Sequence, residues 1–305
     1  MNSSPASGRW ALALHGGAGV KAGRDYGRAE ACLARLVTQG AERLSAGDAA
    51  LDVVEDLTAA MEAAGLFVAG RGAAPNRLGQ VELDASLMCG RQGRAGAVAA
   101  IQGAASPIRV ARLVMDRSAH VLLAGDGAAA FAAEQDCERI GDPTLWLTTP
   151  DGFDSADLED GHGTVGAAAL DRAGHLAAAT STGGTYGALP GRVGDSAVIG
   201  AGTWADDLVA VSCTGEGEAF IRANAASDLA ARLRYGGQSL DEAALAVLNT
   251  VRRRDGDGGL IAITRDGEIV TPFDTDGMKR ATVAWDKRPR VGSVGHVIRD
   301  ASDLI

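Results

Sequence analysis

The chain has 305 residues, of which 46% are hydrophobic and only 4% aromatic, and its formal net charge is −10. This acidic balance argues against a general nucleic-acid or anionic-membrane partner, because phosphate binding needs basic patches. With so few aromatic rings, the core must be built from Ala, Val and Leu, which suits closely packed layers of sheet and helix. A small anionic substrate would need local Arg or Lys side chains to overcome the negative field.

Targeting signals and metal-ligand patterns are missing from the sequence. No apolar run is long enough to span a bilayer, and residues 1–5 lack the regions of a signal peptide, so we expect a soluble cytoplasmic protein. The cysteines form no C-x-x-C pair and the histidines show no ligand spacing, so we expect buried thiols and no structural zinc. The cysteines are Cys32, Cys89, Cys137 and Cys213.

Apolar periodicity predicts strands and helices through the first 135 residues. Asp48 is the expected N-cap of a second helix, and Gly65 lies just past its end. In chain order we expect a strand at 10–14, helices at 27–44 and 49–64, a half-buried strand at 81–87, a strand at 95–101, a helix at 107–115, a strand at 120–124 and a helix at 127–134.

From about residue 136 to residue 162 the apolar period disappears. This stretch contains Asp142-Pro143, the turn-forming run 149–152 and an acidic run at 154–160. We interpret it as a surface linker, and its position directly before Gly163-Thr164 favours a linker that is processed.

Strand and helix signals return after the linker. In chain order we expect a hairpin of 164–170 with 175–182, strands at 198–204 and 208–213, helices at 218–235 and 240–253, and a hairpin of 260–264 with 268–272. Because strands and helices do not alternate strictly, we predict an α+β fold in which two packed sheets are covered by helices, not a doubly wound parallel sheet.

The dipeptide Gly163-Thr164 ends the linker and begins an apolar strand. If the bond between the two residues were cut, Thr164 would carry a hydroxyl nucleophile and a free α-amine. An α-amine has an ordinary pKa of about 7.7–8.0, so it is a usable base at neutral pH. Many strands begin with a threonine, so the other motifs have to show whether Thr164 is a nucleophile or an ordinary strand residue.

Several clusters of unusual composition accompany this dipeptide. Together, and in this order, they resemble the isoaspartyl peptidase/L-asparaginase family, the plant-type asparaginases, which are N-terminal nucleophile hydrolases. The resemblance covers most of residues 10–280. The clusters are His-Gly-Gly-Ala-Gly at 15–19, Glu-Leu-Asp-Ala-Ser-Leu-Met at 82–88, Gly-Thr-Val-Gly at 163–166, Thr-Ser-Thr-Gly-Gly at 180–184, Gly-Arg-Val-Gly-Asp-Ser at 191–196, Ser-Cys-Thr-Gly-Glu-Gly-Glu at 212–218 and Pro-Phe-Asp-Thr-Asp-Gly-Met at 272–278.

The resemblance implies an αββα four-layer sandwich made as one inactive precursor domain of residues 1–305. The precursor would cut itself between Gly163 and Thr164. This would give an α subunit of residues 1–163, with the linker at about 136–163, and a β subunit of residues 164–305. Two αβ units would then form a dimer, a heterotetramer of chains, and no organic cofactor is implied.

The resemblance also assigns catalytic roles. Thr164 would be the nucleophile, and the hydroxyl of Thr182 would face and orient it. Thr214 and the backbone N–H of Gly215 would form the oxyanion hole. Gly16 and Gly17 are expected to pack under the nucleophile.

An amino-acid substrate presents a carboxylate and an ammonium group. Arg192 offers a bidentate fork for the first and Asp195 an acceptor for the second, and the matching family residues have these roles. Gly217 would lend its carbonyl to the ammonium group. The alternative for Arg192 and Asp195 is a local surface ion pair three residues apart, worth less than about 1 kcal/mol.

Three features depart from the family pattern. Val68 replaces an asparagine, Cys89 replaces an aspartate, and no lysine precedes the 191–196 loop. These changes leave substrate preference and rate open. The family also holds a sodium ion with backbone carbonyls in the loop before residue 70, and likeness alone suggests the carbonyls of Met61, Glu62, Ala64, Phe67, Ala69 and Arg71 here.

We therefore expect a self-processing threonine amidohydrolase that cleaves β-aspartyl (isoaspartyl) dipeptides and also L-asparagine through an acyl-enzyme on Thr164. Its partner would be the small-molecule substrate, with no nucleic acid or membrane. Two relatives with other substrates remain as alternatives, an aspartylglucosaminidase and a threonine endoprotease. Gly163 argues mildly against both, because they usually have Asp at that position. A non-catalytic amino-acid-binding homologue also remains, and Val68 keeps it open.

Overall fold

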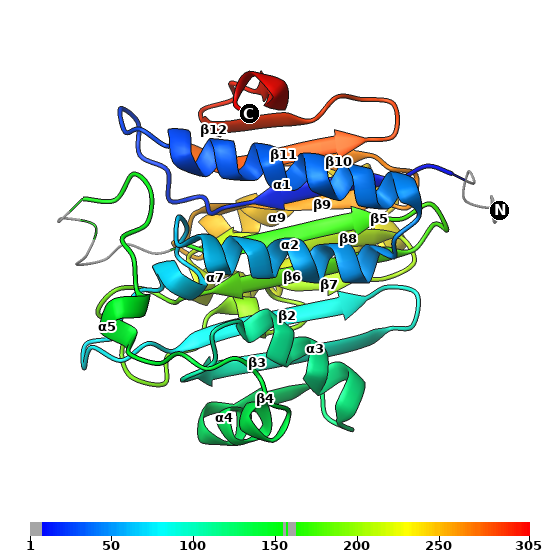
Figure 1. Cartoon of the computed structure of the whole chain (residues 1–305). Coiled ribbons are helices and arrows are strands. Elements are labelled where there is room, and N and C mark those ends of the chain that lie inside the picture. The colour runs from blue at the N-terminus through cyan, green and yellow to red at the C-terminus, as the bar shows by residue number, and fades with distance from the viewer. Residues whose placement is uncertain (1–7, 155–156, 158–162) are drawn as a thin grey trace.

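The computed structural model describes residues 8–154, 157 and 163–305, and Figure 1 draws the remaining residues in grey. Its largest element is a nine-stranded sheet in the order β13-β12-β11-β1-β5-β6-β2-β3-β4. All neighbours in this sheet are antiparallel except β3 and β4. The strands are β1 (Ala11–His15), β2 (Leu83–Cys89), β3 (Arg94–Ile101), β4 (Leu122–Ala124), β5 (Val165–Leu170), β6 (Leu176–Thr182), β11 (Gly277–Ala284), β12 (Arg290–Val294) and β13 (Arg299–Asp300).

The centre of the large sheet is rich in alanine. Every residue of β5 and β6 is buried, and their sequences are VGAAAL and LAAATST. Small side chains on both faces allow other layers to approach the sheet closely, which explains how a chain with few aromatic residues fills its core.

A second sheet packs on one face of the first. It has the order β10-β9-β8-β7, formed by β7 (Thr203–Ala205), β8 (Val209–Gly215), β9 (Gly258–Thr264) and β10 (Ile269–Val270). Ile261 and Ile263 of β9 belong to a buried cluster that includes Ala168 of β5 and Ala178 of β6. This cluster holds the two sheets together.

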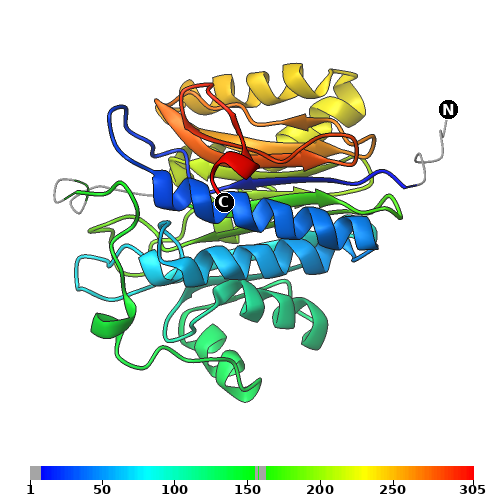
Figure 2. The same cartoon turned by 45° about the horizontal axis from the view of Figure 1, so that its top comes forward.

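Helices cover the outer face of each sheet. α1 (Gly27–Ala46), α2 (Ala50–Ala64) and α3 (Pro107–Arg117) share a core with the large sheet, and α1 and α2 lie across it in Figure 1. α7 (Gly217–Ala223), α8 (Ala225–Gly236) and α9 (Leu240–Arg252) share a core with the small sheet. In Figure 2 the yellow helices lie on the opposite side of the molecule from the blue ones. The described residues contain no helix with the length and apolar character needed to cross a membrane.

Two predicted helix details are wrong. The N-cap of α2 is Ala49 without a side-chain cap, because Asp48 instead accepts a hydrogen bond from Arg43 at 2.7 Å. The helix expected at 218–235 is two helices, α7 and α8. Asn224 separates them with a left-handed backbone (φ 49°), which no α-helix can continue through.

Two strand predictions also need correction, and β11 was not predicted. β2 is not half-buried, since all seven of its residues, including Asp84 and Ser86, lie inside. The strand expected at 198–204 is only the three residues of β7, preceded by η2 (Asp195–Ala197). Apolar periodicity did not predict β11, where the buried Lys279 and Arg280 interrupt the pattern. Those two cations stack at 4.8 Å over Tyr26 and 4.9 Å over Phe273.

The first half of the predicted linker lies against the body of the protein. It contains α5 (Pro143–Trp146), capped by Asp142, and follows α4 (Gly125–Glu134). The buried carboxylate of Asp151 accepts the backbone N–H of Ala29 at 2.9 Å. Most of the acidic run at 154–160 lies outside the described residues.

Leu87 tests the packing of the large sheet. Its side chain is fully buried in β2, so Leu87→Ala should lower the free energy of unfolding by about 2–5 kcal/mol, measured by urea denaturation. Leu245→Ala, at a position that is 56% exposed on α9, should change it by less than about 0.5 kcal/mol. Equal effects of the two substitutions would contradict this packing.

Candidate active site

The Gly163–Thr164 bond lies where β5 begins beside the end of β6. Val165 pairs with Ser181, so the antiparallel ladder brings Thr182 next to Thr164. The hydroxyl of Thr182 donates to the carbonyl oxygen of Gly163 at 2.6 Å, and both threonines are at least 95% buried. Thr182 therefore polarises the carbonyl of the bond that the sequence marks for cleavage.

The glycine turn after β1 packs under this bond, as predicted. A Cβ added to Gly17 would lie 3.4 Å from the carbonyl oxygen and 3.5 Å from the nitrogen of Thr164. Gly17 also has φ +101°, a backbone conformation that residues other than glycine rarely adopt. A Cβ on Gly16 would collide with the ring of Phe67 at 2.5 Å. The turn is thus fixed between the nucleophile and the core.

Val68 lies directly against Gly163. A Cβ on Gly163 would be 3.1 Å from the Cβ of Val68, so no larger residue fits there without movement. The carbonyl of Val68 accepts the N–H of Gly183 at 3.0 Å. The residue that departs from the family pattern thus supports the backbone on both sides of the site.

Two carboxylates, one just before β2 and one within it, hold the glycine-rich loop that carries Arg192. Glu82 accepts the N–H of Gly191 at 3.0 Å, and the buried Asp84 accepts the N–H of Gly194 at 3.1 Å. Burial raises the pKa of Asp84 to about 6. The acidic motif at 82–88 therefore positions the loop and does not face the nucleophile.

Arg192 and Asp195 do not form the local surface ion pair that was the alternative. The guanidinium of Arg192 binds Glu218 through two hydrogen bonds of 2.9 and 2.7 Å. Asp195 is 3% exposed, and its Oδ2 atom has no hydrogen-bond partner. Burial raises the pKa of Asp195 to about 7. A Cβ on Gly217 would lie 3.0 Å from Arg192 Nη2, so this glycine keeps the two groups accessible.

Thr214 and Gly215 end β8 close to the nucleophile. Thr214 Oγ1 accepts the N–H of Ala18 at 3.3 Å, which leaves its own proton to donate elsewhere. Gly215 has φ +150°, and a Cβ there would lie 2.2 Å from the carbonyl oxygen of Asp257. Only glycine fits at this position.

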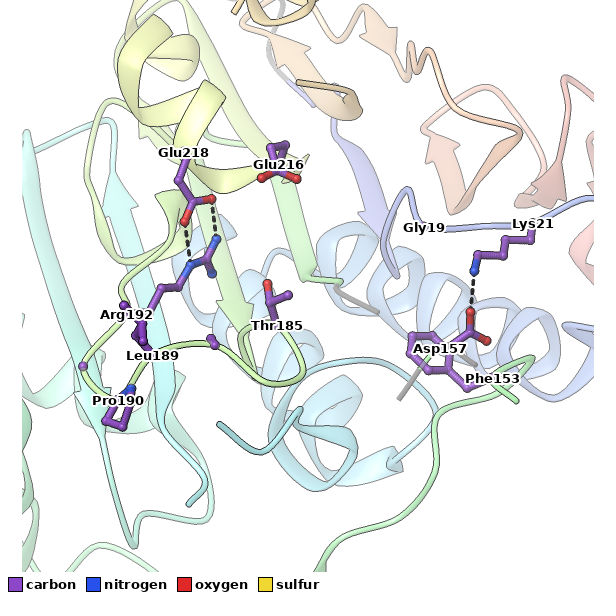
Figure 3. A pocket seen from close by; sticks show the side chains of 12 residues that line it. Gly19, Lys21, Phe153, Asp157, Thr185, Leu189, Pro190, Arg192, Glu216 and Glu218 are labelled. Carbon is purple, nitrogen blue, oxygen red and sulfur yellow. Dashed lines mark hydrogen bonds and ion pairs between the residues drawn. The ribbon is translucent and has the colours of Figure 1, made fainter. Parts of the chain in front are cut away.

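Most of the predicted residues line one small pocket. Thr214 is fully buried beside it and does not line it. Thr185 and Arg192 also line a larger adjoining cavity of about 830 Å³, which Figure 3 shows. The predicted residues at the small pocket are Gly163, Thr164, Thr182, Arg192, Asp195, Gly215 and Gly217.

Sequence comparisons identify the family of this chain. A sequence model of the family described as asparaginase matches residues 8–151 and 142–293. The isoaspartyl peptidase of Escherichia coli is 44% identical over 322 aligned positions, covering 98% of this chain and 99% of the relative. The chain belongs to the asparaginase family.

Other members of the asparaginase family extend this similarity. The isoaspartyl peptidase of Salmonella typhimurium is 44% identical over 295 positions, covering 88% of this chain and 94% of its own. A probable isoaspartyl peptidase/L-asparaginase 2 of Arabidopsis thaliana is 39% identical over 317 positions, covering 92% and 97%. The resemblance found in the motifs is confirmed over nearly the whole chain.

This asparaginase-family chain also has a buried hydroxyl network that the motifs did not reveal. His15 Nε2 lies 2.8 Å from Ser212 Oγ, which lies 2.7 Å from Thr180 Oγ1. Thr203 continues the network at 2.6 Å, and Ser86 at 2.8 Å. The network joins both sheets beneath the nucleophile. Its members lie on five different strands, so no local sequence pattern could have identified the network.

Glu62 is a second feature that the sequence did not reveal. Its fully buried carboxylate accepts hydrogen bonds from Ser106 at 2.5 Å, Ser181 at 2.6 Å and the N–H of Ile108 at 3.1 Å. Burial raises its pKa to about 7, against the opposing effect of these donors. Because Ser181 precedes Thr182, Glu62 ties α2 to the strand that positions the Thr182 hydroxyl.

His15 gives this site a pH-dependent stability. Burial lowers the pKa of His15 to about 3, whereas an unfolded histidine has a pKa near 6.5. At pH 5.5 the histidine of the unfolded state binds a proton that folded His15 does not. This lowers the free energy of unfolding of the wild type by about 1.4 kcal/mol relative to pH 7.5. The stability cost of His15→Gln should therefore be about 1.4 kcal/mol smaller at pH 5.5 than at pH 7.5.

Urea titrations of both proteins at the two pH values measure this difference. Carboxylates with raised pKa values, such as Glu62, are present in both proteins and cancel. His120→Gln, at an exposed position, is the matched control. A cost of His15→Gln that does not change with pH would show that His15 is not held neutral.

Proposed function

We propose that this chain is a self-processing N-terminal threonine hydrolase that cleaves β-aspartyl dipeptides and L-asparagine. The observation that carries the proposal is the hydrogen bond from Thr182 to the Gly163 carbonyl, in a pocket that also holds Arg192 and Asp195. The names of the relatives, isoaspartyl peptidase and isoaspartyl peptidase/L-asparaginase, support this substrate class.

Self-cleavage would begin with attack of the Thr164 hydroxyl on the carbonyl carbon of Gly163. The new C–O bond forms, the C–N bond breaks, and the hydroxyl proton moves to the nitrogen of Thr164, which becomes a free amine. Water then hydrolyses the ester, which leaves a carboxylate on Gly163. The Thr182 hydroxyl, 2.6 Å from the carbonyl oxygen, stabilises negative charge that develops there.

Substrate binding would use the charged residues of the pocket. Arg192 would receive the α-carboxylate of the aspartyl group, with Glu218 holding the guanidinium plane in place through two hydrogen bonds. The partnerless carboxylate oxygen of Asp195 and the carbonyl of Gly217 would accept the α-ammonium. An ammonium beside Asp195 favours the ionised carboxylate, so binding would lower the raised pKa.

Hydrolysis would follow with Thr164 as nucleophile and its own amine as base. The hydroxyl attacks the side-chain amide carbonyl of the substrate. The amine takes the hydroxyl proton and passes it to the leaving nitrogen. Thr214 Oγ1 and the N–H of Gly215 would hold the oxyanion, and loss of one such donor typically raises the barrier by about 2.7–4 kcal/mol. Water then releases aspartate from Thr164.

The arrangement of the layers supports further proposals about the whole molecule. Helices, large sheet, small sheet and helices would form the αββα sandwich of N-terminal nucleophile hydrolases, cut into residues 1–163 and 164–305. We propose that two such αβ units form a dimer and that the enzyme works in the cytoplasm. The free state of the four cysteines fits a reducing compartment.

We also propose that the loop between α2 and η1 (Gly70–Gly72) holds a sodium ion. A Cβ on Gly70 would lie 2.5 Å from the carbonyl oxygen of Glu62, so glycine keeps this carbonyl-lined turn closed. The carbonyls of Phe67 and Ala69 each accept one backbone N–H and keep a second lone pair, whereas that of Arg71 accepts both the N–H and, at 3.3 Å, the hydroxyl of Thr148. Met61 and Ala64 would complete the predicted set. The ion would stabilise the loop that carries Val68.

Processing is the first test. The wild type should yield two chains, the second beginning at Thr164, as seen by intact mass and N-terminal sequencing. The mature protein should hydrolyse β-aspartyl-leucine and L-asparagine. Thr164→Ala should abolish processing and turnover, because it removes the only atom that can attack. A single uncut chain that hydrolyses these substrates would overturn the proposal.

Thr182 is tested by the rate of processing. Thr182→Val keeps the side-chain size but removes the hydroxyl on the Gly163 carbonyl, so self-cleavage should slow about 100-fold or more. Thr182→Ser keeps the hydroxyl and is the matched control. Equal cleavage rates of the two variants, followed on denaturing gels, would contradict the role of this hydrogen bond.

Sodium is tested by thermal stability. At a concentration 100 times its Kd, sodium should stabilise the protein by about 2.7 kcal/mol, seen as a higher Tm than in choline chloride of equal ionic strength. Gly70→Ala, whose Cβ would displace the Glu62 carbonyl, should lose this increase. Equal Tm values of the wild type in the two salts would exclude the site.

A further inference from the structure

The larger cavity beside the nucleophile pocket is where the second residue of a dipeptide would lie. In the proposed function the aspartyl part would bind at the small pocket around Thr164, and Thr185 and Arg192 line both spaces. Ammonia from asparagine needs no further room, but a dipeptide leaving group does. A cavity of about 830 Å³ holds an amino acid of any size, so volume alone does not select among dipeptides.

Two ion pairs neutralise most of the charge on the cavity wall. Arg192 binds Glu218 on one side, and Lys21 lies 2.5 Å from Asp157 on the other (Figure 3). Glu216 lies between these pairs in Figure 3. No hydrogen bond or ion pair of its carboxylate occurs within the part of the chain that the structure describes, so it leaves the wall with an uncompensated negative charge.

The backbone fixes Glu216 close to the reaction. It lies between Gly215 and Gly217, which both line the nucleophile pocket, while Glu216 itself lines the larger cavity. Its N–H donates to the carbonyl of Asp257 at 2.9 Å, which anchors its position. Consecutive Cα atoms are about 3.8 Å apart, so the Cα of Glu216 is one residue spacing from each of two glycines that line the small pocket.

We propose that Glu216 makes this enzyme favour β-aspartyl dipeptides whose second residue carries a positive side chain. A cation at about 5–6 Å from Glu216 is attracted, and an anion is repelled, at the dielectric of a half-open cavity. The α-carboxylate of the leaving group is common to all dipeptides and cancels in the comparison. The apolar wall at Leu189 and Pro190 accommodates the aliphatic stem of a long cationic side chain. This proposal rests on the proposed function.

The test compares kcat/KM for β-aspartyl-lysine, β-aspartyl-leucine and β-aspartyl-glutamate on the matured enzyme. L-Asparagine, whose leaving group is ammonia, provides the reference rate for each variant. We expect the lysine dipeptide to exceed the glutamate dipeptide about tenfold, with leucine between them. Glu216→Gln should reduce this ratio to about one to three, and Glu216→Lys should invert it.

Glu134→Gln removes the same charge from an exposed position at the end of α4 and should keep the wild-type ratio. Raising choline chloride from 0.05 to 0.5 M should shrink the wild-type ratio without any substitution, since salt screens an exposed carboxylate. A wild-type ratio near one, or one that survives in Glu216→Gln, would overturn the role of Glu216. Failure of the wild type to hydrolyse any of the four substrates would instead overturn the proposed function.

Discussion

The hydrogen bond from Thr182 to the Gly163 carbonyl exists because β5 and β6 pair in one register. Val165 opposite Ser181 brings the end of one strand to the beginning of the other, and a shift by one residue would turn Thr182 to the opposite face of the sheet. Burial on both faces prevents such a shift, since every residue of both strands is packed. The position of Thr164 is therefore set by sheet packing, and the loops around it complete the pocket.

Polar groups inside this fold separate into two kinds. Those near Thr164, from His15 Nε2 through Ser212 to Thr180, hydrogen-bond one another and join the two sheets. Buried polar groups normally have such partners, because an unpaired one costs about 1–3 kcal/mol. Asp195 is one of the exceptions among the described residues, with one carboxylate oxygen buried and unpartnered at the candidate site. That cost is acceptable where a ligand supplies the missing partner, which is why an ammonium group fits there so well.

Sequence reasoning was most reliable where the physical signal is local. The helices α1, α3 and α9 and the β5–β6 hairpin follow from apolar periodicity and turn residues, and ordered motifs located Thr164, Thr182, Arg192 and Asp195. It failed where tertiary contacts decide. Asp84 was expected on the exposed face of a half-buried strand, and the strand that carries buried Lys279 was not predicted, because only distant backbone groups and rings satisfy these side chains. Glu218 as the partner of Arg192, and Glu62 as the support of Ser181, join residues 26 and 119 positions apart. No single-sequence pattern encodes such distances.

The segment before Gly163 is bound to the rest of the chain at two points. Asp151 caps the start of α1 through Ala29, and Asp157 contacts Lys21 and Arg24. If the bond after Gly163 is broken, the new chain end is still only six residues from Asp157, a reach of at most about 20 Å. Cleavage would thus keep the negatively charged carboxylate of the new chain end close to the catalytic centre. Maturation would change the local field as well as the covalent structure, and the two products would part only on unfolding.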